Sequence, residues 1–360
     1  MDETDIGFEE ELPGDDPENQ VADELYERLS IKVDRGQEPL RIDKFLMARI
    51  EGATRNKIQQ AIDAGLVTVN GGPIKSNYKI KPADEIIFLS EDHPDQSEIV
   101  PEPMNIDYVY EDESVIVINK PAGIVVHPGS GNYSGTLVNG VAHHLMLQNP
   151  ELTEFTLPRF GLVHRIDKNT SGLLLMAKNQ RALNHLAKQF FNHTIERKYI
   201  ALVWGDVEQD EGTIVAHVGR NPRYRKQFEA FPDGEHGKHA ITHYKVLERF
   251  HYVTLVQCVL ETGRTHQIRV HMKHIGHTLF GDDHYGGDRI LKGTVYTKYK
   301  QFVDNCLALC PRQALHAQVL GFKHPDRNED MHFEQPIPAD MQAVIEKWRR
   351  YNKAKGLMDE

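Results

Sequence analysis

One stretch of the sequence places polar and charged side chains directly between apolar segments. His164, Arg165 and Asp167 stand between Leu162 and the apolar run Leu173–Met176. A carboxylate in such a setting loses hydration, which raises its pKa, whereas an arginine partner keeps it charged. An ionised carboxylate held there could act as a nucleophile or as a base. The aspartate is therefore a candidate for catalysis. The same pattern is also typical of a buried structural ion pair, which is the alternative.

Three other stretches are dense in polar groups beside apolar runs. They are Asn119–Gly123 with His127–Gly131, Gly135 and Thr136; Arg197–Tyr199; and Thr262–His271. Tyr199 could stack on an exposed base or relay a proton, but on sequence alone an ordinary strand tyrosine is the favoured interpretation. If residues 265–275 are helical, Arg269 stands at the edge of an apolar stripe and is a suitable partner for Asp167. That stripe consists of Ile268, Met272 and Ile275.

In their order and composition, these stretches closely resemble the motifs of the pseudouridine synthases of the RluA/RluD group, which isomerise uridine in RNA. The resemblance runs from about residue 107 to about residue 338, and its one departure in the central motif is Ile166, where leucine is usual. It implies that Asp167 is the catalytic aspartate, Tyr199 the active-site tyrosine and Arg269 the arginine paired with the aspartate. It also implies that Arg165 helps to fill the space left by the extruded base. Without the resemblance, Arg165 would be interpreted as a surface arginine.

The resemblance further implies an isomerase that needs no cofactor, because the base is detached from nitrogen, rotated and rejoined through carbon without gain or loss of atoms. The RluD branch acts on large-subunit ribosomal RNA, which is therefore the implied substrate and partner. Which uridines are modified, and whether free RNA or an assembling subunit is the substrate, stay open. Residues expected to bind the substrate or shape the loop are His164, Thr170, Ser171, Gly172, Arg264, His266 and Leu315.

The elements that must position these residues are mainly short strands. Strands are predicted at Val115–Ile118, Leu173–Met176, Tyr199–Val203 and Val253–Leu260, and a helix at Arg181–Phe191. Strands that mostly lack long helices between them favour an α+β domain with a mixed, largely antiparallel sheet.

A small basic segment, residues 37–90, has helix and strand patterns of its own. The first predicted helix has one apolar face, formed by Ile42, Phe45, Leu46 and Ile50. A second helix is predicted from the possible cap Thr54 to Gly65, with Ile58, Ala61 and Ile62 facing inward. A strand at Leu66–Val69 and a turn at Asn70–Gly72 are predicted to follow it. The segment resembles the S-four RNA-binding domain through 41–46, 54–58 and 65–71, and is expected to be a small α/β domain. The basic residues expected to bind RNA are Arg41, Lys44, Arg55 and Lys57.

Composition and charge complete the predicted organisation. The 360 residues are 39% hydrophobic and 26% charged, which is typical of globular proteins. Twelve acids and one arginine in residues 1–30 account for the whole net charge of −11, since the rest balances at 41 basic and 41 acidic residues. We therefore expect an acidic disordered leader (1–36), a linker (91–106), a catalytic domain (107–345) and a C-terminal tail (346–360).

Other classes of protein are weighed against this interpretation. His239 and His243, or His271, His274 and His277, have spacing that could place metal ligands on a helix face, but no recognised zinc pattern accompanies them, so no metal is expected. A non-catalytic RNA-binding assembly factor and a two-carboxylate glycosidase are the alternatives. Three cysteines without a disulfide framework, no membrane-length apolar run and no signal-peptide pattern favour a cytoplasmic protein, taken as a monomer without an obligate protein partner.

Overall fold

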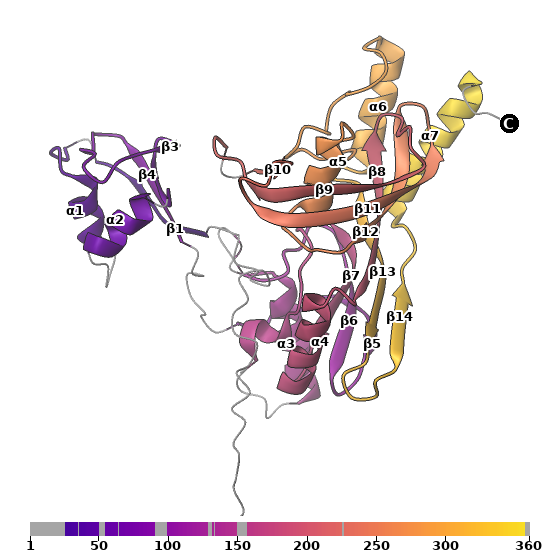
Figure 1. Ribbon diagram of the computed structural model, residues 1–360, viewed down its shortest axis with the longest axis horizontal. Helices are drawn as coiled ribbons and strands as arrows, with labels where there is room; N and C mark the ends of the chain where they lie inside the picture. Colours follow the sequence, from indigo (N-terminus) through magenta and orange to yellow (C-terminus); the bar gives the residue numbers. More distant parts are fainter. Residues whose placement is uncertain are drawn as a thin grey trace, which may run out of the picture. The chain divides into compact units, whose positions relative to one another are not determined.

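The computed structural model describes residues 26–356 apart from 35, 50–54, 64, 91–98, 129–131, 133, 150–156 and 225–226. It contains two compact units, which are coloured along the chain in Figure 1. The first runs to Val100 and includes Pro128–Ser134, and the second comprises Pro101–His127 and Gly135–Glu360. Among the described residues, no helix combines the length and apolar character needed to cross a membrane.

The first unit packs two helices on a four-stranded antiparallel sheet of order β1-β4-β2-β3. Its elements are β1 (Tyr26–Lys32), α1 (Ile42–Met47), α2 (Arg55–Asp63), β2 (Val67–Val69), β3 (Gly72–Pro73) and β4 (Glu85–Ser90). Phe45, Leu46, Ile58 and Ile62 are buried in its core, as the helical periodicity predicts. The predicted turn is present, with Asn70 and Gly71 both at positive φ. Ile50 and the expected cap Thr54 lie outside the described residues.

The second unit is built on a ten-stranded sheet of order β10-β9-β11-β12-β8-β13-β7-β6-β5, with β14 paired to β13. Its strands are β5 (Asp107–Glu111), β6 (Val115–Lys120), β7 (Ser171–Ala177), β8 (Glu196–Trp204), β9 (Glu211–Arg220), β10 (Phe228–Phe231), β11 (Lys238–Arg249), β12 (Val253–Leu260), β13 (Leu315–Lys323) and β14 (Asp330–Glu334). Only β13 and β7 pair in parallel among the described strands. The expected α+β fold with a mixed, largely antiparallel sheet is confirmed.

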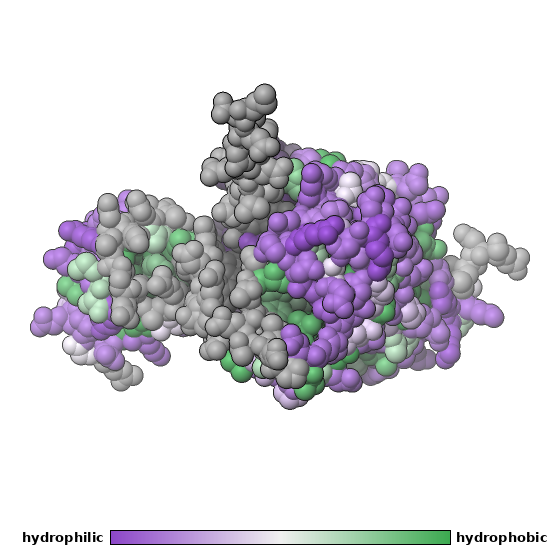
Figure 2. Space-filling view, turned by 90° about the horizontal axis from the view of Figure 1, so that it is seen from below, coloured by the Kyte–Doolittle hydropathy of each residue, from purple (hydrophilic) through white to green (hydrophobic). Residues whose placement is uncertain are grey.

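Helices of the second unit cover different parts of this sheet (Figure 1). They are α3 (Leu137–Gln148), η1 (Pro158–Gly161, a 3-10 turn), α4 (Gln180–Phe191), α5 (Gln267–His274), α6 (Thr297–Leu309) and α7 (Ala339–Lys355). Helix α4 begins where the Asn179 side chain accepts the Ala182 N–H, and it buries Leu186 and Phe190 against β6 and β7. Helices α6 and α7 pack with β8 and β12 around Trp204 and Trp348. Figure 2 shows mainly hydrophilic residues on the visible face of this unit.

Two predicted boundaries are wrong. Residues 26–32, assigned to a disordered leader, form strand β1, because Ile31 packs into the first core while the strand pairs with β4. Residues 346–355, assigned to a tail, continue helix α7, where Trp348 is fully buried. Both segments are rich in charged residues, so their composition did not reveal the few apolar residues that pack into the cores. The rest of the predicted leader, residues 1–25, lies outside the described residues.

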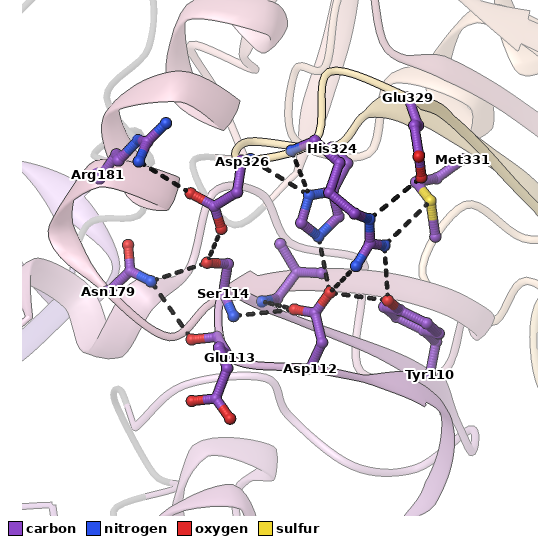
Figure 3. A network of polar contacts seen from close by, with 12 residues as sticks. Tyr110, Asp112, Glu113, Ser114, Asn179, Arg181, His324, Asp326, Glu329 and Met331 are labelled. Carbon is purple, nitrogen blue, oxygen red and sulfur yellow. Dashed lines mark hydrogen bonds and ion pairs between the residues drawn. The ribbon is translucent and has the colours of Figure 1, made fainter.

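A polar network joins the β5–β6 turn to the β13–β14 turn (Figure 3). Asp112 accepts hydrogen bonds from the Ser114 and Val115 amides at 2.9 Å and contacts His324 Nε2 at 2.7 Å. Burial alone would raise the pKa of this carboxyl, but its many hydrogen bonds lower it. Ser114 also hydrogen-bonds to Asp326. The network links the β5–β6 turn to the β13–β14 turn.

Candidate active site

Asp167 lies on the loop that leads into β7, and buried polar contacts hold this loop in place. Its carbonyl accepts the Thr170 N–H at 3.0 Å, which closes the turn behind the aspartate. Lys120, fully buried at the end of β6, donates to the carbonyls of Pro121, Ile124 and Lys168 at 2.8, 2.9 and 3.0 Å. Burial lowers the pKa of Lys120 to about 7. The lysine thereby ties the aspartate loop to the motif that follows β6.

Strand β13 brings Tyr199 and the aspartate loop together. Ala317 of β13 pairs with Tyr199 of β8 on one side and with Gly172 of β7 on the other. Gly172 has φ +112°, and an added Cβ would lie 2.2 Å from the Ala317 carbonyl oxygen. Only glycine therefore allows β7 to start this close to β13. The close approach explains why glycine follows Ser171 in the central motif.

The ion pair expected between Arg269 and Asp167 is present. Arg269 stands on α5, and its Nη1 donates to Asp167 Oδ2 at 2.8 Å. Burial alone would raise the pKa of Asp167, but the neighbouring His266 and Arg269 side chains lower it to about 2. The side chain of Asp167 remains 23% exposed. A charged carboxylate is thus held at a position that a substrate can reach.

Asp282 completes the arrangement and was missed by the sequence analysis. Its two carboxylate oxygens accept from Arg269 Nε and Nη2 at 2.7 and 2.9 Å, and its side chain is 1% exposed. A bidentate contact fixes the plane of a guanidinium group. Arg269 therefore presents its remaining nitrogen, Nη1, to Asp167. The only feature of the sequence that pointed to Asp282 was indirect: a buried arginine such as Arg269 needs a carboxylate partner.

Arg312 is a second residue that the sequence analysis missed. It precedes β13, is 7% exposed, and donates from Nη1 to the carbonyls of Asn169 and Leu315 at 3.1 and 3.2 Å. Its Nε and Nη2 contact Asp340 of α7 at 2.7 and 3.0 Å. The guanidinium thus links the aspartate loop, the start of β13 and helix α7.

Tyr199 is buried on β8, with 6% of its surface exposed. Burial raises the pKa of its phenol; nearby Arg197 opposes this and Asp167 adds to it. Tyr199 is therefore neutral at physiological pH. Arg197, two residues earlier and on the same face of the strand, is also buried and its guanidinium lies over the Phe190 ring.

The other predicted substrate-binding residues have different placements. His164 is buried, its Nε2 accepts the Leu175 N–H at 2.9 Å, and burial lowers its pKa to about 3. This gives His164 a role in the fold, and the predicted substrate contact has no support in its placement. Thr170 is buried and accepts from Gln313 at 3.3 Å, and Leu315 is buried at the start of β13. Arg165 is half-buried beside Asp167.

Two further predicted residues, Arg264 and His266, precede helix α5. Arg264 is half-buried and donates from Nε to the His239 carbonyl at 3.1 Å. His266 occupies the N-cap position of the helix without a side-chain capping hydrogen bond, and its Nε2 lies 3.9 Å from Asp167 Oδ1. Of the predicted side chains, His266 and Arg269 are those with a measured distance to the Asp167 carboxylate.

The histidine spacings weighed for a metal do not bring ligands together. His239 and His243 lie on strand β11, where residues four apart are separated by about 13 Å. His271 is buried and contacts the Thr242 hydroxyl at 2.9 Å. In the described part of the chain, no group of three or more possible ligands is arranged to hold a metal ion. Cys306 and Cys310 are free, buried thiols, as the sequence analysis expected.

In the first unit, the predicted RNA-binding arginines share a buried carboxylate. Arg41 Nη2 and Arg55 Nε contact Asp43 at 2.8 and 3.2 Å. Burial raises the pKa of Asp43, but these arginines and the Lys44 amide lower it to about 2. Both arginines remain partly exposed, Lys44 is exposed, and the side chain of Lys57 lies outside the described residues. Exposed basic groups on a helix pair are suited to contact phosphates.

The ionised Asp167 is paired with the buried Arg269, near Tyr199, on a mixed sheet. This arrangement is the one expected of the class of RNA pseudouridine synthases. Comparison with known families agrees: the profile described as RNA pseudouridylate synthase matches residues 114–274, and the S4 domain profile matches residues 40–86. The chain belongs to the RNA pseudouridine synthase family and is an isomerase with an N-terminal S4 domain.

Two relatives and one solved structure document the similarity. An uncharacterized RNA pseudouridine synthase of Chlorobaculum parvum is 47% identical over 322 residues, covering 89% of this chain and 98% of the relative. Ribosomal large subunit pseudouridine synthase D of Neisseria meningitidis is 41% identical over 332 residues, covering 92% and 84%. The human RNA pseudouridylate synthase domain containing 4 structure has a TM-score of 0.55 at 22% identity, covering 68% and 93%, and shares the fold.

Proposed function

We propose that this enzyme converts specific uridines of large-subunit ribosomal RNA to pseudouridine. The substrate rests on similarity to the Neisseria meningitidis protein, whose printed name specifies the ribosomal large subunit. The site rests on one observation, the 2.8 Å contact that keeps the partly exposed Asp167 carboxylate paired with Arg269. That contact supplies the charged carboxylate that the reaction requires.

Asp167 acts on the target nucleotide as the nucleophile or the base. The reaction breaks the bond from C1′ to N1 of uracil, forms the bond from C1′ to C5, and moves the C5 proton to N1, so atoms and electrons balance without a cofactor. Arg269 keeps the carboxylate ionised and orients it. Tyr199, neutral and buried beside this loop, stacks on the uracil and assists proton transfer.

The target base must leave its stack to reach a carboxylate at this depth. We assign Arg165 to the gap that the flipped base leaves, since it stands two residues from Asp167. In the S4 domain, Arg41, Lys44, Arg55 and Lys57 would contact the RNA backbone. A binding-only assembly factor has no evident use for a paired carboxylate that faces a polyanion. A monomer in the cytoplasm, without an obligate protein partner, stays a prediction from the sequence.

The experiment is to map pseudouridine in ribosomal RNA from cells that lack the protein, by carbodiimide labelling and primer extension. The cells are then rescued with the wild type or with Asp167→Asn. We expect large-subunit sites to be lost in the null strain and restored by the wild type alone. An unchanged large-subunit map would move the substrate to another RNA, and restoration by Asp167→Asn would remove the aspartate from the mechanism.

A further inference from the structure

His266 occupies an unusual backbone position at the edge of the aspartate site. It precedes the first residue of α5 with φ +56° and ψ 17°, a left-handed conformation that residues other than glycine seldom adopt. Its ring lies among the rings of Phe228, His284 and Tyr285, with centroids 5.4–5.6 Å away. Left-handed strain at a non-glycine residue persists where the surroundings hold it, often at functional sites.

The hydrogen bonds of Tyr285 determine which nitrogen of His266 carries the proton. The Tyr285 hydroxyl oxygen accepts the Phe228 N–H at 3.2 Å and lies 2.7 Å from His266 Nδ1. Tyr285 is 5% exposed, so its hydroxyl proton needs a protein acceptor. Among the described residues, Nδ1 is the acceptor within reach. Nδ1 therefore receives the Tyr285 proton, and in the neutral ring the N–H is at Nε2.

This tautomer directs an N–H group toward the catalytic carboxylate without binding it. Nε2 lies 3.9 Å from Asp167 Oδ1, which is too long for a hydrogen bond, and its side chain is 18% exposed. Nε2 makes no hydrogen bond to any residue that the structure describes. Burial lowers the pKa of His266 to about 4, so the ring is neutral at physiological pH. A neutral donor leaves Asp167 charged and adds no second cation to the Arg269 pair.

We propose that His266 is a further catalytic residue, whose fixed Nε2–H donates to an oxygen of the target nucleotide bound against Asp167. The inference rests on the proposed function of Asp167. The acceptor is a uracil carbonyl or the ribose 2′-hydroxyl, both of which lie next to the bond that breaks. When the base departs from C1′, negative charge spreads onto the uracil oxygens, and a donor oriented in advance stabilises that charge.

The chemical test compares His266→Asn with His266→Gln in single-turnover reactions on a ribosomal RNA fragment. The glutamine amide can approach the Nε2 position, whereas the shorter asparagine amide matches Nδ1. We expect His266→Asn to slow the reaction by about 10²-fold with little change in RNA affinity, and His266→Gln to recover part of that loss. His251→Gln, a change at an exposed histidine that also has a positive φ, is the control and should keep the wild-type rate. A wild-type rate for His266→Asn would overturn the proposal.

The structural test is independent of turnover. The ring nitrogens of His266 in the ¹⁵N-histidine-labelled protein should report a proton on Nε2, and Tyr285→Phe should shift that equilibrium toward Nδ1. A proton on Nδ1 in the wild type would overturn the inference. This spectrum also separates the two proposals, because an RNA fragment left unmodified by the wild type would refute the substrate while the spectrum still tests His266.

A fragment with 2′-deoxyuridine at the target identifies the acceptor. If His266→Asn and wild type react equally on it, the ribose hydroxyl is the acceptor. If His266→Asn still reacts more slowly than the wild type, a uracil carbonyl is the acceptor. Either result upholds the donor, provided that the two differ on the unmodified fragment.

Discussion

Asp282 holds Arg269 through two hydrogen bonds, at 2.7 and 2.9 Å, from a position that is almost completely buried. The nitrogen that this pairing leaves over, Nη1, is the one that contacts Asp167. The orientation of the Asp167 carboxylate, the proposed catalytic group, thus depends on a second carboxylate that is buried away from the solvent. Buried pairs of this kind contribute little net stability, but the loss of one partner is costly.

Replacing Asp282 by asparagine should therefore impair both stability and catalysis. The change removes the buried partner of Arg269 and leaves only the partly exposed Asp167 to pair with it, which should cost about 3–5 kcal/mol of unfolding free energy. A guanidinium free to shift by about 1 Å should lower the single-turnover rate by about 10²-fold. Urea denaturation and single-turnover assays measure the two effects. Asp283→Asn changes the exposed neighbour and should be close to wild type; equal losses in the two variants would contradict the role given to Asp282.

The same variant should also move the pH dependence. The pKa of Asp167 is lowered in the folded state to about 2, so its contribution to stability is present above its unfolded pKa and is lost as pH falls through about 2. With Arg269 less well oriented, the pKa of Asp167 should rise. The acid limb of the single-turnover rate in Asp282→Asn should then lie at higher pH than in the wild type, and coincident limbs would argue against this coupling.

Gly172 sets the distance between β7 and β13. An alanine there would place its Cβ 2.2 Å from the Ala317 carbonyl oxygen in a backbone conformation of φ +112°. Strain and overpacking together should cost about 2–5 kcal/mol and displace the aspartate loop. The matched control is Gly123→Ala, also at positive φ but with nothing within 4 Å of the added Cβ, which should cost about 1–2 kcal/mol. Thermal unfolding of both variants separates steric contact from backbone strain, and equal costs would mean that the strands can move apart.

Lys120 should make the protein more stable as the pH rises above neutral. Burial lowers its pKa from 10.5 to about 7 in the folded state, so between these values the unfolded chain binds more protons than the folded one. The free energy of unfolding contributed by this group therefore increases from about pH 7 to 10. Urea denaturation across this range should show the rise in Lys188→Met, an exposed lysine on α4, and lose it in Lys120→Met. The same pH profile in both variants would contradict it.

The sequence was most informative where local patterns decide the structure. The strand Val253–Leu260 was predicted with its observed bounds, and the turn at Asn70 and Gly71 followed from residue type alone. The pair of Asp167 and Arg269 was found because the resemblance linked two motifs that lie 102 residues apart. Helical periodicity made Arg269 a suitable candidate, but only the resemblance assigned it as the partner of Asp167.

Contacts between distant segments were the part that the sequence could not supply. Strand β1 was missed because its partner β4 lies more than fifty residues away, as the pairing of Ile31 with Ile86 shows. Asp282 stands beside Asp283, and only the fold decides which carboxylate meets Arg269. Histidine is a common active-site residue, yet the ring of His164 accepts a hydrogen bond from the Leu175 amide. Burial, which separates these roles, depends on the whole fold.

Lys44 offers a test of the S4 domain that leaves the catalytic unit intact. The side chain is exposed on α1, next to Asp43, which already engages Arg41 and Arg55. If Lys44 contacts a phosphate, Lys44→Ala should weaken RNA binding and reduce the slope of log affinity against log salt by about 0.7–0.9, because one fewer counterion is released. Lys353→Ala removes an exposed charge from α7 and should leave the slope unchanged. Titrations of the full-length protein with ribosomal RNA at several salt concentrations measure both slopes. Since Lys44 belongs to the first unit and Asp167 to the second, the single-turnover rate at saturating enzyme should equal that of the wild type. A slower rate there would mean that the domain does more than bind RNA.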